Sequence, residues 1–328
     1  MRLCVFGAGA IGGHLAARLA AAGHEVCAVA RGANLEAMTA DGIALHSGGC
    51  TISGRVRASD RPADLGEQDV VFVTTKATGL AAFAASAHPL AGARTAFVFV
   101  QNGIPWWYAQ GLAASRPRPP DLSRLDPGGA LARAIAPERV IGAVVYSSND
   151  LVQPGVIHNH SPGKNMLVIG EPDDRPSERV EALREALCAA DMHSPPASDI
   201  RLSVWDKLML NFGSTLCLPL GEPISALLQD PALRAVRERL FAEGRAIARA
   251  HGVRTEDAPK RPGGVQISGA IPHKPSMLQD YERGRPMEVE AILIAPRAFA
   301  RAAGLETPTL EVLAAITARL AAAKGLYS

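Results

Sequence analysis

The sequence predicts an α/β protein in two parts, a doubly wound parallel sheet followed by an all-α C-terminal half. In the first part, short apolar runs alternate with helical patterns, which is typical of strands joined by crossover helices. A glycine-rich turn separates the first apolar run from the first helical pattern. After Asp199 strand signals almost disappear, and helical patterns follow at residues 203–211, 231–252, 288–303 and 309–323.

The first 31 residues contain the most informative motif. Residues 3–6 are typical of a buried strand, and residues 13–23 have helical spacing up to a final glycine. The loop between them has the pattern GxGxxG, whose glycines allow a tight turn, approach of a pyrophosphate, and close packing of helix on strand. The order of strand, turn and helix predicts a Rossmann-type site, because the helix N-terminus attracts phosphate. The residues expected to contact the dinucleotide are Gly7, Gly9, Ala10, Ile11 and Gly12.

Arg31 follows the second predicted strand, residues 25–30. In NAD-binding proteins this position normally holds an Asp or Glu that binds the ribose 2′-hydroxyl. A guanidinium suits a 2′-phosphate instead, so the sequence favours NADPH as the cofactor. The alternative is that Arg31 is a surface residue that closes a turn before Gly32.

Two further strands end in polar residues. Residues 69–75 lead to Lys76, and residues 95–100 are followed closely by Asn102. Ligands of open parallel sheets bind beyond the carboxyl ends of the strands. We therefore expect Arg31, Lys76 and Asn102 to converge on one crevice and to contact the cofactor.

The remaining segments complete a two-domain plan. The patterns indicate a short helix at 35–40, a hairpin at 43–57, a long surface loop at 115–129, strands at 140–146, 156–160 and 166–169, and a helix at 179–190. Pro195 and Pro196 mark the hinge. The predicted domains are residues 1–197, which bind the nucleotide, and residues 198–328, which bind the substrate and form subunit contacts.

Composition limits the partners and the compartment. The 328 residues suit two domains, and the net charge is +2, from 34 basic and 32 acidic residues. No basic run with interleaved aromatics occurs, which argues against nucleic acid and membrane partners. The five cysteines lack CxxC and metal-ligand spacing, so we expect reduced core thiols and no metal site. Neither a signal peptide nor an apolar stretch of about 18 residues is found, which predicts a cytoplasmic protein.

Lys207 and Asn211 are the first candidates for chemistry in the helical half. They lie four residues apart in WDKLMLN, which places both on one helix face among apolar neighbours. A lysine facing a cleft can donate a proton to a carbonyl oxygen while hydride reaches the carbon. The alternative is an exposed lysine paired with a nearby acid.

Ser276 and Glu288 are the next candidates. Ser276 begins a helical stretch and could bind a carboxylate through its hydroxyl and the adjacent N–H, or it could simply be an N-cap. Glu288 opens the following helix, where the helix dipole favours an acid in any case.

These motifs resemble the ketopantoate reductase (2-dehydropantoate 2-reductase) family almost from end to end. The matching landmarks are GAGAIGG with Arg31, TTKA around Lys76, QNG around Asn102, WDKLMLN around Lys207 and Asn211, and the long SMLQDYERGRPMEVEAI from Ser276. The resemblance implies NADPH-dependent reduction of a 2-oxo acid to a 2-hydroxy acid, with ketopantoate as the family's best known substrate.

The resemblance also assigns roles. Lys207 matches the catalytic lysine, proposed as general acid, and Glu288 the acidic residue of the substrate site. Arg31 and Lys76 match residues that hold the 2′-phosphate. A proton donor at the C2 oxygen lowers the cost of the developing alkoxide, while fixed partners orient the substrate. The substrate-binding set that results is Asn102, Lys207, Asn211, Thr215, Ser276 and Glu288.

Two features depart from the family pattern. Thr215 stands where the family often has a second asparagine, and Trp106 and Trp107 make the segment after Asn102 bulkier. The tryptophans either place aromatic surface near the nicotinamide or pack against the domain interface. Both features leave open a paralogue that acts on another branched or larger 2-oxo acid.

Two other functions are compatible with the predicted fold. A 3-hydroxy acid or opine dehydrogenase would have other motifs around its catalytic lysine or histidine, and none matches. A binding protein that senses NADPH without turnover needs neither Lys207 nor Glu288, so their presence argues against it. The apolar helical half favours a homodimer.

Overall fold

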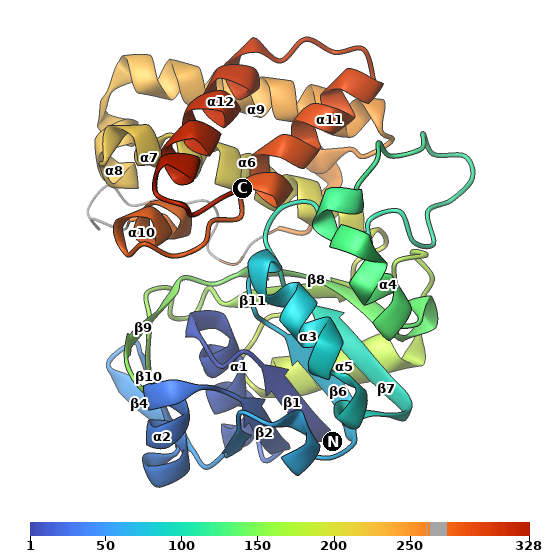
Figure 1. Ribbon diagram of the computed structural model, residues 1–328, viewed down its shortest axis with the longest axis vertical. Coiled ribbons are helices and arrows are strands. Elements are labelled where there is room, and N and C mark those ends of the chain that lie inside the picture. The colour runs from blue at the N-terminus through green and yellow to red at the C-terminus, as the bar shows by residue number, and fades with distance from the viewer. Residues whose placement is uncertain (261, 263–273) are drawn as a thin grey trace. The chain divides into compact units, whose positions relative to one another are not determined.

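The computed structural model describes residues 1–260, 262 and 274–328, and it divides into two compact units (Figure 1). Unit 1 consists mainly of Met1–Gln101 and Asp126–Ile200. Unit 2 contains Asn102–Leu125, Arg201–Ala258 and the described residues from 274 onward. The sequence did not predict that Asn102–Leu125 belongs with the helices, and the boundary between residues 197 and 198 stays a prediction.

Unit 1 is built on a seven-stranded sheet in the order β11-β8-β7-β6-β1-β2-β5. All neighbouring strands are parallel except β11, which runs antiparallel to β8. Strands are added on both sides of β1, which confirms the predicted doubly wound α/β fold. The strands are β1 (Arg2–Phe6), β2 (Glu25–Val29), β5 (Arg57–Ser59), β6 (Gln68–Val73), β7 (Ala91–Phe99), β8 (Val140–Tyr146) and β11 (Met166–Gly170).

A second, four-stranded sheet in unit 1 has the order β4-β3-β10-β9. Its strands are β3 (Ile43–Ser47), β4 (Cys50–Gly54), β9 (Asn149–Gln153) and β10 (Val156–Asn159). The predicted hairpin at residues 43–57 is present as β3 and β4, but β3 also pairs in parallel with β10. That pairing joins strands far apart in the chain, which local patterns do not reveal.

Helix α1 (Ala10–Ala21) packs against both sheets, and every residue from Gly12 to Leu19 is buried. A Cβ on Gly12 would lie 2.8 Å from Val5 Cγ1 of β1, and one on Gly13 would lie 2.8 Å from Ile157 Cγ1 of β10. Small residues on two sides of the helix therefore allow both sheets to close on it. This explains why the segment is rich in Gly and Ala rather than amphipathic.

Helices cover both faces of the large sheet. Phe83 of α3 packs edge-on against Phe6, Phe97 and Phe99, with ring centroids 4.9, 5.9 and 5.8 Å apart. Leu183 of α5 belongs instead to the core that α1 shares. The helices of unit 1 besides α1 are α2 (Gly32–Asp41), α3 (Leu80–Ser86), α4 (Ala130–Ala134) and α5 (Glu178–Ala189).

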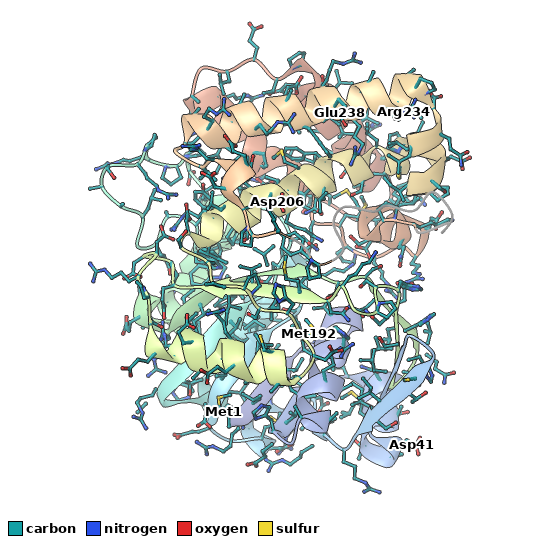
Figure 2. The ribbon with its side chains drawn as sticks, turned by 180° about the vertical axis from the view of Figure 1, so that it is seen from behind. Met1, Asp41, Met192, Asp206, Arg234 and Glu238 are labelled. Atoms are coloured by element: carbon teal, nitrogen blue, oxygen red, sulfur yellow. The ribbon has the colours of Figure 1, made fainter. Side chains whose placement is uncertain are left out.

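The described residues of unit 2 form helices and no strands, which confirms the predicted all-α part. Gly213 of α6 lies against Phe241, and Gly244 of α9 lies against Phe212, so these two long helices approach closely. The helices are α6 (Ile200–Thr215), α7 (Cys217–Leu220), α8 (Ile224–Gln229), α9 (Pro231–Ala250), α10 (Ser276–Glu282), the π-helical turn η8 (Glu290–Ile294), α11 (Ala295–Ala302) and α12 (Pro308–Ala323). Arg234 and Glu238 on α9 are labelled in Figure 2.

Arg201, at the start of α6, is fully buried and holds the segment that follows Asn102. Its guanidinium donates to the carbonyl oxygen of Tyr108 at 2.8 and 3.0 Å and to that of Gln110 at 2.7 Å. The guanidinium carbon also lies 5.9 Å from the ring centroid of Trp107, which is fully buried. Trp107 therefore packs in the core of unit 2, and Trp106 beside it is buried as well.

The five cysteines are free thiols, but only three are buried. The expectation of core thiols is wrong for Cys50 and Cys188, which are exposed. Cys50 begins the edge strand β4, and Cys188 lies on the outer side of α5. Among the described residues, no helix is long and apolar enough to cross a membrane.

Candidate active site

The glycine loop after β1 is held by hydrogen bonds to the neighbouring strands. Gly7 has a φ of +101°, in the region that favours glycine, and its N–H donates to the Val29 carbonyl at 3.0 Å. The hydroxyl of Thr74, which follows β6, donates to the Gly7 carbonyl at 2.8 Å. The turn is thus fixed between β2 and β6, which flank β1 in the sheet.

Gly9 leaves space where a dinucleotide phosphate would fit. A Cβ on Gly9 would meet no atom within 4 Å. Gly9 is also the N-cap of α1, and no side chain caps this helix. The first-turn N–H groups of Ala10 and Ile11 therefore lack an internal partner and carry the partial positive charge of the helix N-terminus. An anionic group such as a pyrophosphate fits this end of the helix.

Asn34 of α2 is a supporting residue that the sequence did not single out. Its Nδ2 donates to the Ala8 carbonyl at 2.7 Å, and its Oδ1 accepts from the Gly155 N–H at 2.8 Å. The side chain thus ties the glycine loop to the start of β10. Its only sequence signal is its position just after Arg31, where a polar residue at a helix start is ordinary.

Arg31 and Lys76 lie at the same edge of the sheet as the glycine loop. Arg31 is exposed, directly follows β2 and is the N-cap residue of α2. Lys76 is half-buried and follows β6. Because β2 and β6 are the two neighbours of β1, the positions of Arg31 and Lys76 flank the loop between β1 and α1. Asn102 belongs to unit 2, so its convergence with them stays a prediction.

Thr75 and Gln101 are polar residues at this edge that the sequence motifs did not single out. Gln101 Nε2 donates to the carbonyls of Val73 at 2.7 Å and Thr75 at 2.9 Å. Gln101 Oε1 and the Thr75 hydroxyl are buried and have no hydrogen-bond partner in the described part of the chain. Both could bond to a group bound there. Gln101 could have been suspected, since it precedes Asn102 at a strand end.

Lys207 and Asn211 lie one turn apart on the same face of α6, and both are half-buried. Figure 2 labels Asp206, the residue before Lys207, on this helix. Asn211 Nδ2 is buried without a hydrogen-bond partner among the described residues, so it can donate to a ligand. One turn later, the buried Thr215 hydroxyl donates to the Asn211 carbonyl at 2.8 Å.

Ser276 begins α10, the helix that packs against the end of α6. The Thr215 hydroxyl lies 3.8 Å from the Met277 sulfur, next to Ser276. Ser276 itself is exposed. Its interpretation as an N-cap is wrong, because Pro275 holds the N-cap position and no side chain caps the helix. The Ser276 hydroxyl is therefore not used by the helix start.

Asn102 and Glu288 lie together in unit 2. Asn102 Nδ2 is 3.4 Å from Glu288 Oε2, a long hydrogen bond, and Glu288 is only 9% exposed. Glu288 lies just before η8, which agrees with its predicted place at the opening of a helix. An amide thus faces a buried carboxylate, and such a pair can orient a substrate hydroxyl.

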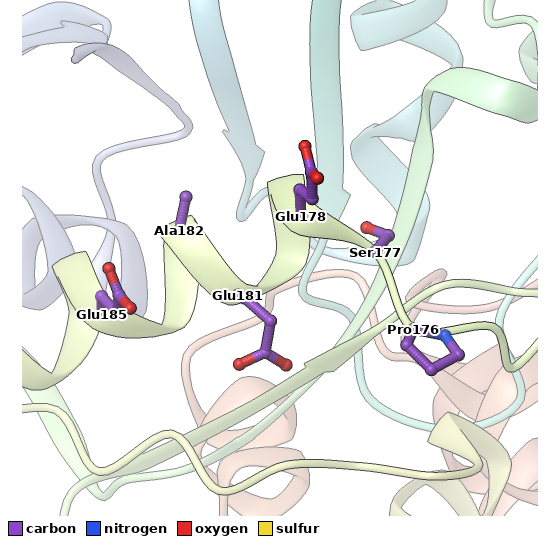
Figure 3. Close-up of a pocket in the computed structure, with 6 residues that line it drawn as sticks. All are labelled: Pro176, Ser177, Glu178, Glu181, Ala182 and Glu185. Atoms are coloured by element: carbon purple, nitrogen blue, oxygen red, sulfur yellow. The ribbon is translucent and has the colours of Figure 1, made fainter.

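A shallow hollow lies elsewhere, on one side of α5 (Figure 3). Its lining residues are Pro176, Ser177, Glu178, Glu181, Ala182 and Glu185. Pro176 and Ser177 directly precede α5 and the other four residues lie on it, where Glu181 pairs with Arg184. Because no strand end contributes to it, this acidic hollow is unrelated to the candidate active site.

A Rossmann-type unit together with a helical unit that presents Lys207, Asn211 and a buried Asn102–Glu288 pair defines a class, the two-domain pyridine-nucleotide-dependent oxidoreductases. The family model for ketopantoate reductase PanE/ApbA matches residues 3–113, and the model for the C-terminal part of the same family matches residues 199–321. A 2-dehydropantoate 2-reductase of Mesorhizobium japonicum is 40% identical over 334 residues, which span 100% of both chains. The chain belongs to the ketopantoate reductase family, whose members are oxidoreductases that act on CH–OH groups.

Solved structures agree with this assignment. A crystal structure from Ralstonia solanacearum MolK2 is 34% identical, has a TM-score of 0.85 and covers 99% of both chains. A 2-dehydropantoate 2-reductase from Geobacter metallireducens is 25% identical, with a TM-score of 0.80 and coverage of 97% of this chain and 99% of the other. D-mandelate dehydrogenase, solved with NADH and anilino(oxo)acetate, has the same fold at 16% identity, with a TM-score of 0.80 and coverage of 99% and 100%.

Proposed function

We propose that this protein reduces a 2-oxo acid to a 2-hydroxy acid with NADPH, and that 2-dehydropantoate or a similar branched 2-oxo acid is the substrate. One observation carries the proposal. The helical unit carries Lys207 and Asn211 on one face of α6, and the Asn211 amide has no hydrogen-bond partner among the described residues. The chain that carries them is 40% identical to a 2-dehydropantoate 2-reductase over its whole length.

The side chains divide the work as the reaction requires. NADPH, when bound, would supply the hydride. Lys207 donates a proton to the C2 oxygen as negative charge develops there, which lowers the barrier most if the ammonium is already in place. Asn211 donates a hydrogen bond to the substrate. Glu288 accepts one from a substrate hydroxyl, and Asn102 holds the Glu288 carboxylate in position.

Ser276 and Thr215 complete the proposed substrate site. The Ser276 hydroxyl binds the substrate carboxylate at the start of α10. Thr215 acts through Asn211, because its hydroxyl bonds to the Asn211 carbonyl and so fixes the turn of α6 that carries the amide. Gly7, Gly9, Ala10, Ile11 and Gly12 bind the pyrophosphate, and Arg31 with Lys76 binds the 2′-phosphate.

A panel of 2-oxo acids tests the reaction. NADPH oxidation is followed by absorbance with 2-dehydropantoate, a shorter branched 2-oxo acid and an aromatic 2-oxo acid. We expect turnover with the branched acids and the highest kcat/KM for 2-dehydropantoate. A higher kcat/KM for another acid would identify a paralogue, and no turnover with any acid would favour an NADPH-sensing protein.

Titration of NADPH and NADH tests the cofactor. We expect NADPH to bind at least about tenfold more tightly than NADH, because Arg31 and Lys76 pair with the 2′-phosphate. Arg31→Ala should remove most of that preference and leave NADH binding nearly unchanged. The matched control is Arg94→Ala, an exposed arginine near the amino end of β7. Equal affinities for both cofactors in the unmodified protein would contradict the assigned role of Arg31.

We also infer that the protein works as a cytoplasmic homodimer. Val312 and Ile316 lie one turn apart on α12 and are 60% and 43% exposed, which leaves an apolar stripe on unit 2. A ketopantoate reductase from Staphylococcus aureus with the same fold is described as dimeric. We propose that a second copy of the chain packs on α12 and buries Val312 and Ile316.

A further inference from the structure

The turn that precedes α11 leaves one carbonyl oxygen without a partner inside the helix. In η8 the Ala295 N–H donates to the Glu290 carbonyl, five residues back, rather than to Ala291 as in an α-helix. The next residue in that register is Pro296, which has no N–H to donate to Ala291. The Ala291 carbonyl instead accepts a hydrogen bond of 2.8 Å from the Ile104 N–H.

Gly103, between Asn102 and Ile104, makes this contact possible. Its φ is +81°, and a Cβ there would lie 2.5 Å from the Ala291 carbonyl carbon and 2.8 Å from the Ala291 Cβ. A side chain at position 103 would therefore be strained and would also push the segment away from η8. Only glycine allows the backbone to approach η8 this closely.

The contact lies directly beside the Asn102–Glu288 pair. Asn102 precedes Gly103, and Glu288 lies one turn before Ala291, whose neighbour Ile292 donates its N–H to the Glu288 carbonyl at 3.1 Å. Both partners of the 3.4 Å amide–carboxylate contact are thus attached to the two backbones that meet at Ala291. Their separation depends on how closely those backbones approach.

We propose that Gly103 and the Ala291 carbonyl together position the Asn102 amide next to the Glu288 carboxylate. This inference rests on the proposed function, in which that pair orients the 2-oxo acid. In this proposal Gly103 acts through Asn102 and not by a contact of its own with substrate or cofactor. The π-helical turn matters because it leaves the Ala291 carbonyl free to accept from the Ile104 N–H. In a regular α-helix this carbonyl would accept from the Ala295 N–H.

The first test is Gly103→Ala, with Gly304→Ala as its matched control. Gly304 also has a positive φ, +65°, but a Cβ there would meet no atom within 4 Å, so the control carries the backbone strain without the collision. We expect Gly103→Ala to lower kcat/KM for the 2-oxo acid about tenfold, mainly through KM, since small misplacements are costly. Gly304→Ala should stay within about twofold. An equal loss in both variants would overturn the proposal.

A double-mutant cycle separates positioning from general damage. If Gly103 acts through Asn102, Gly103→Ala should cost about tenfold in the unmodified protein but less than about twofold in an Asn102→Ala background. The full tenfold loss in both backgrounds would mean that Gly103 acts through something else. NADPH affinity, measured alongside, should change by less than about threefold in Gly103→Ala.

Pro296→Ala tests the anchor without a clash, and it also covers the case in which Gly103→Ala does not fold. Alanine restores an N–H that can compete with Ile104 for the Ala291 carbonyl. We expect faster hydrogen exchange of the Ile104 amide than in the unmodified protein, together with a higher KM for the 2-oxo acid. Unchanged exchange in Pro296→Ala and a well-protected Ile104 amide in Gly103→Ala would refute the anchor. Exchange is independent of turnover, so an inactive unmodified protein would count against the proposed function only.

Discussion

Replacing Lys207 with alanine is expected to lower kcat by about two orders of magnitude or more, the usual contribution of a positioned general acid. Lys207 shares a face of α6 with Asn211, whose amide is buried without a partner among the described residues. Without the ammonium, the C2 oxygen would develop negative charge with no proton donor. Lys207 is not among the residues proposed to bind the cofactor, so the Kd for NADPH should remain nearly unchanged.

The measurement compares kcat and the Kd for NADPH across three variants. Lys207→Arg keeps the positive charge, but its guanidinium does not release a proton at neutral pH, so it should also be slow. Lys324→Ala is the control, because Lys324 is an exposed lysine of the same unit that lies over the Tyr281 ring. If Lys207→Ala retains full kcat, Lys207 is not the proton donor and the proposed mechanism fails.

Local sequence patterns were sufficient for the glycine turn, the first helix and most strands of the large sheet, but they did not reveal α3, α4 or β9. The GxGxxG motif indicated the tight turn at Gly7, where φ is +101°, and the close packing at Gly12, where a Cβ would lie 2.8 Å from Val5 Cγ1. The face shared by Lys207 and Asn211 follows from helix geometry alone. For these residues, the spacing in the chain determines the spacing in the structure.

Long-range contacts account for what the sequence did not reveal. Asn34 bonds to Gly155, and β3 pairs with β10, although each pair is distant in the chain. Asn102–Leu125 clusters with unit 2 because the buried Arg201 holds its carbonyl groups, and an arginine in a helical pattern gives no sign of such a role. The π-helical turn before Pro296 also looked like regular helix in the sequence.

Acidification is expected to destabilise unit 1 through His14, which is fully buried in α1 between the two sheets. Burial, with a smaller contribution from the Arg18 cation, lowers the pKa of His14 from 6.5 to about 3. His14 Nε2 accepts from Arg18 Nε at 2.7 Å, which requires a ring nitrogen without a proton. Arg18 in turn donates to Asp191 at 2.6 Å, which holds the guanidinium beside the His14 ring.

The unfolded chain binds a proton at His14 below about pH 6.5, whereas the folded chain resists it until about pH 3. The contribution of neutral His14 to the free energy of unfolding is therefore complete above pH 6.5. It is lost progressively as the pH falls from 6.5 to about 3. The shift corresponds to roughly 4 to 5 kcal/mol at most. Such a loss is a large part of the stability of an ordinary domain.

Denaturant unfolding of the protein and of His14→Gln at several pH values between 7 and 4 measures this effect. Glutamine can still accept from Arg18 but does not titrate, so the free energy of unfolding of the variant should fall less steeply with pH. His88→Gln, at an exposed site, is the control and should follow the unmodified protein. If the free energies of unfolding of the unmodified protein and of His14→Gln fall equally steeply with pH, His14 does not contribute to acid unfolding. That result would contradict the prediction.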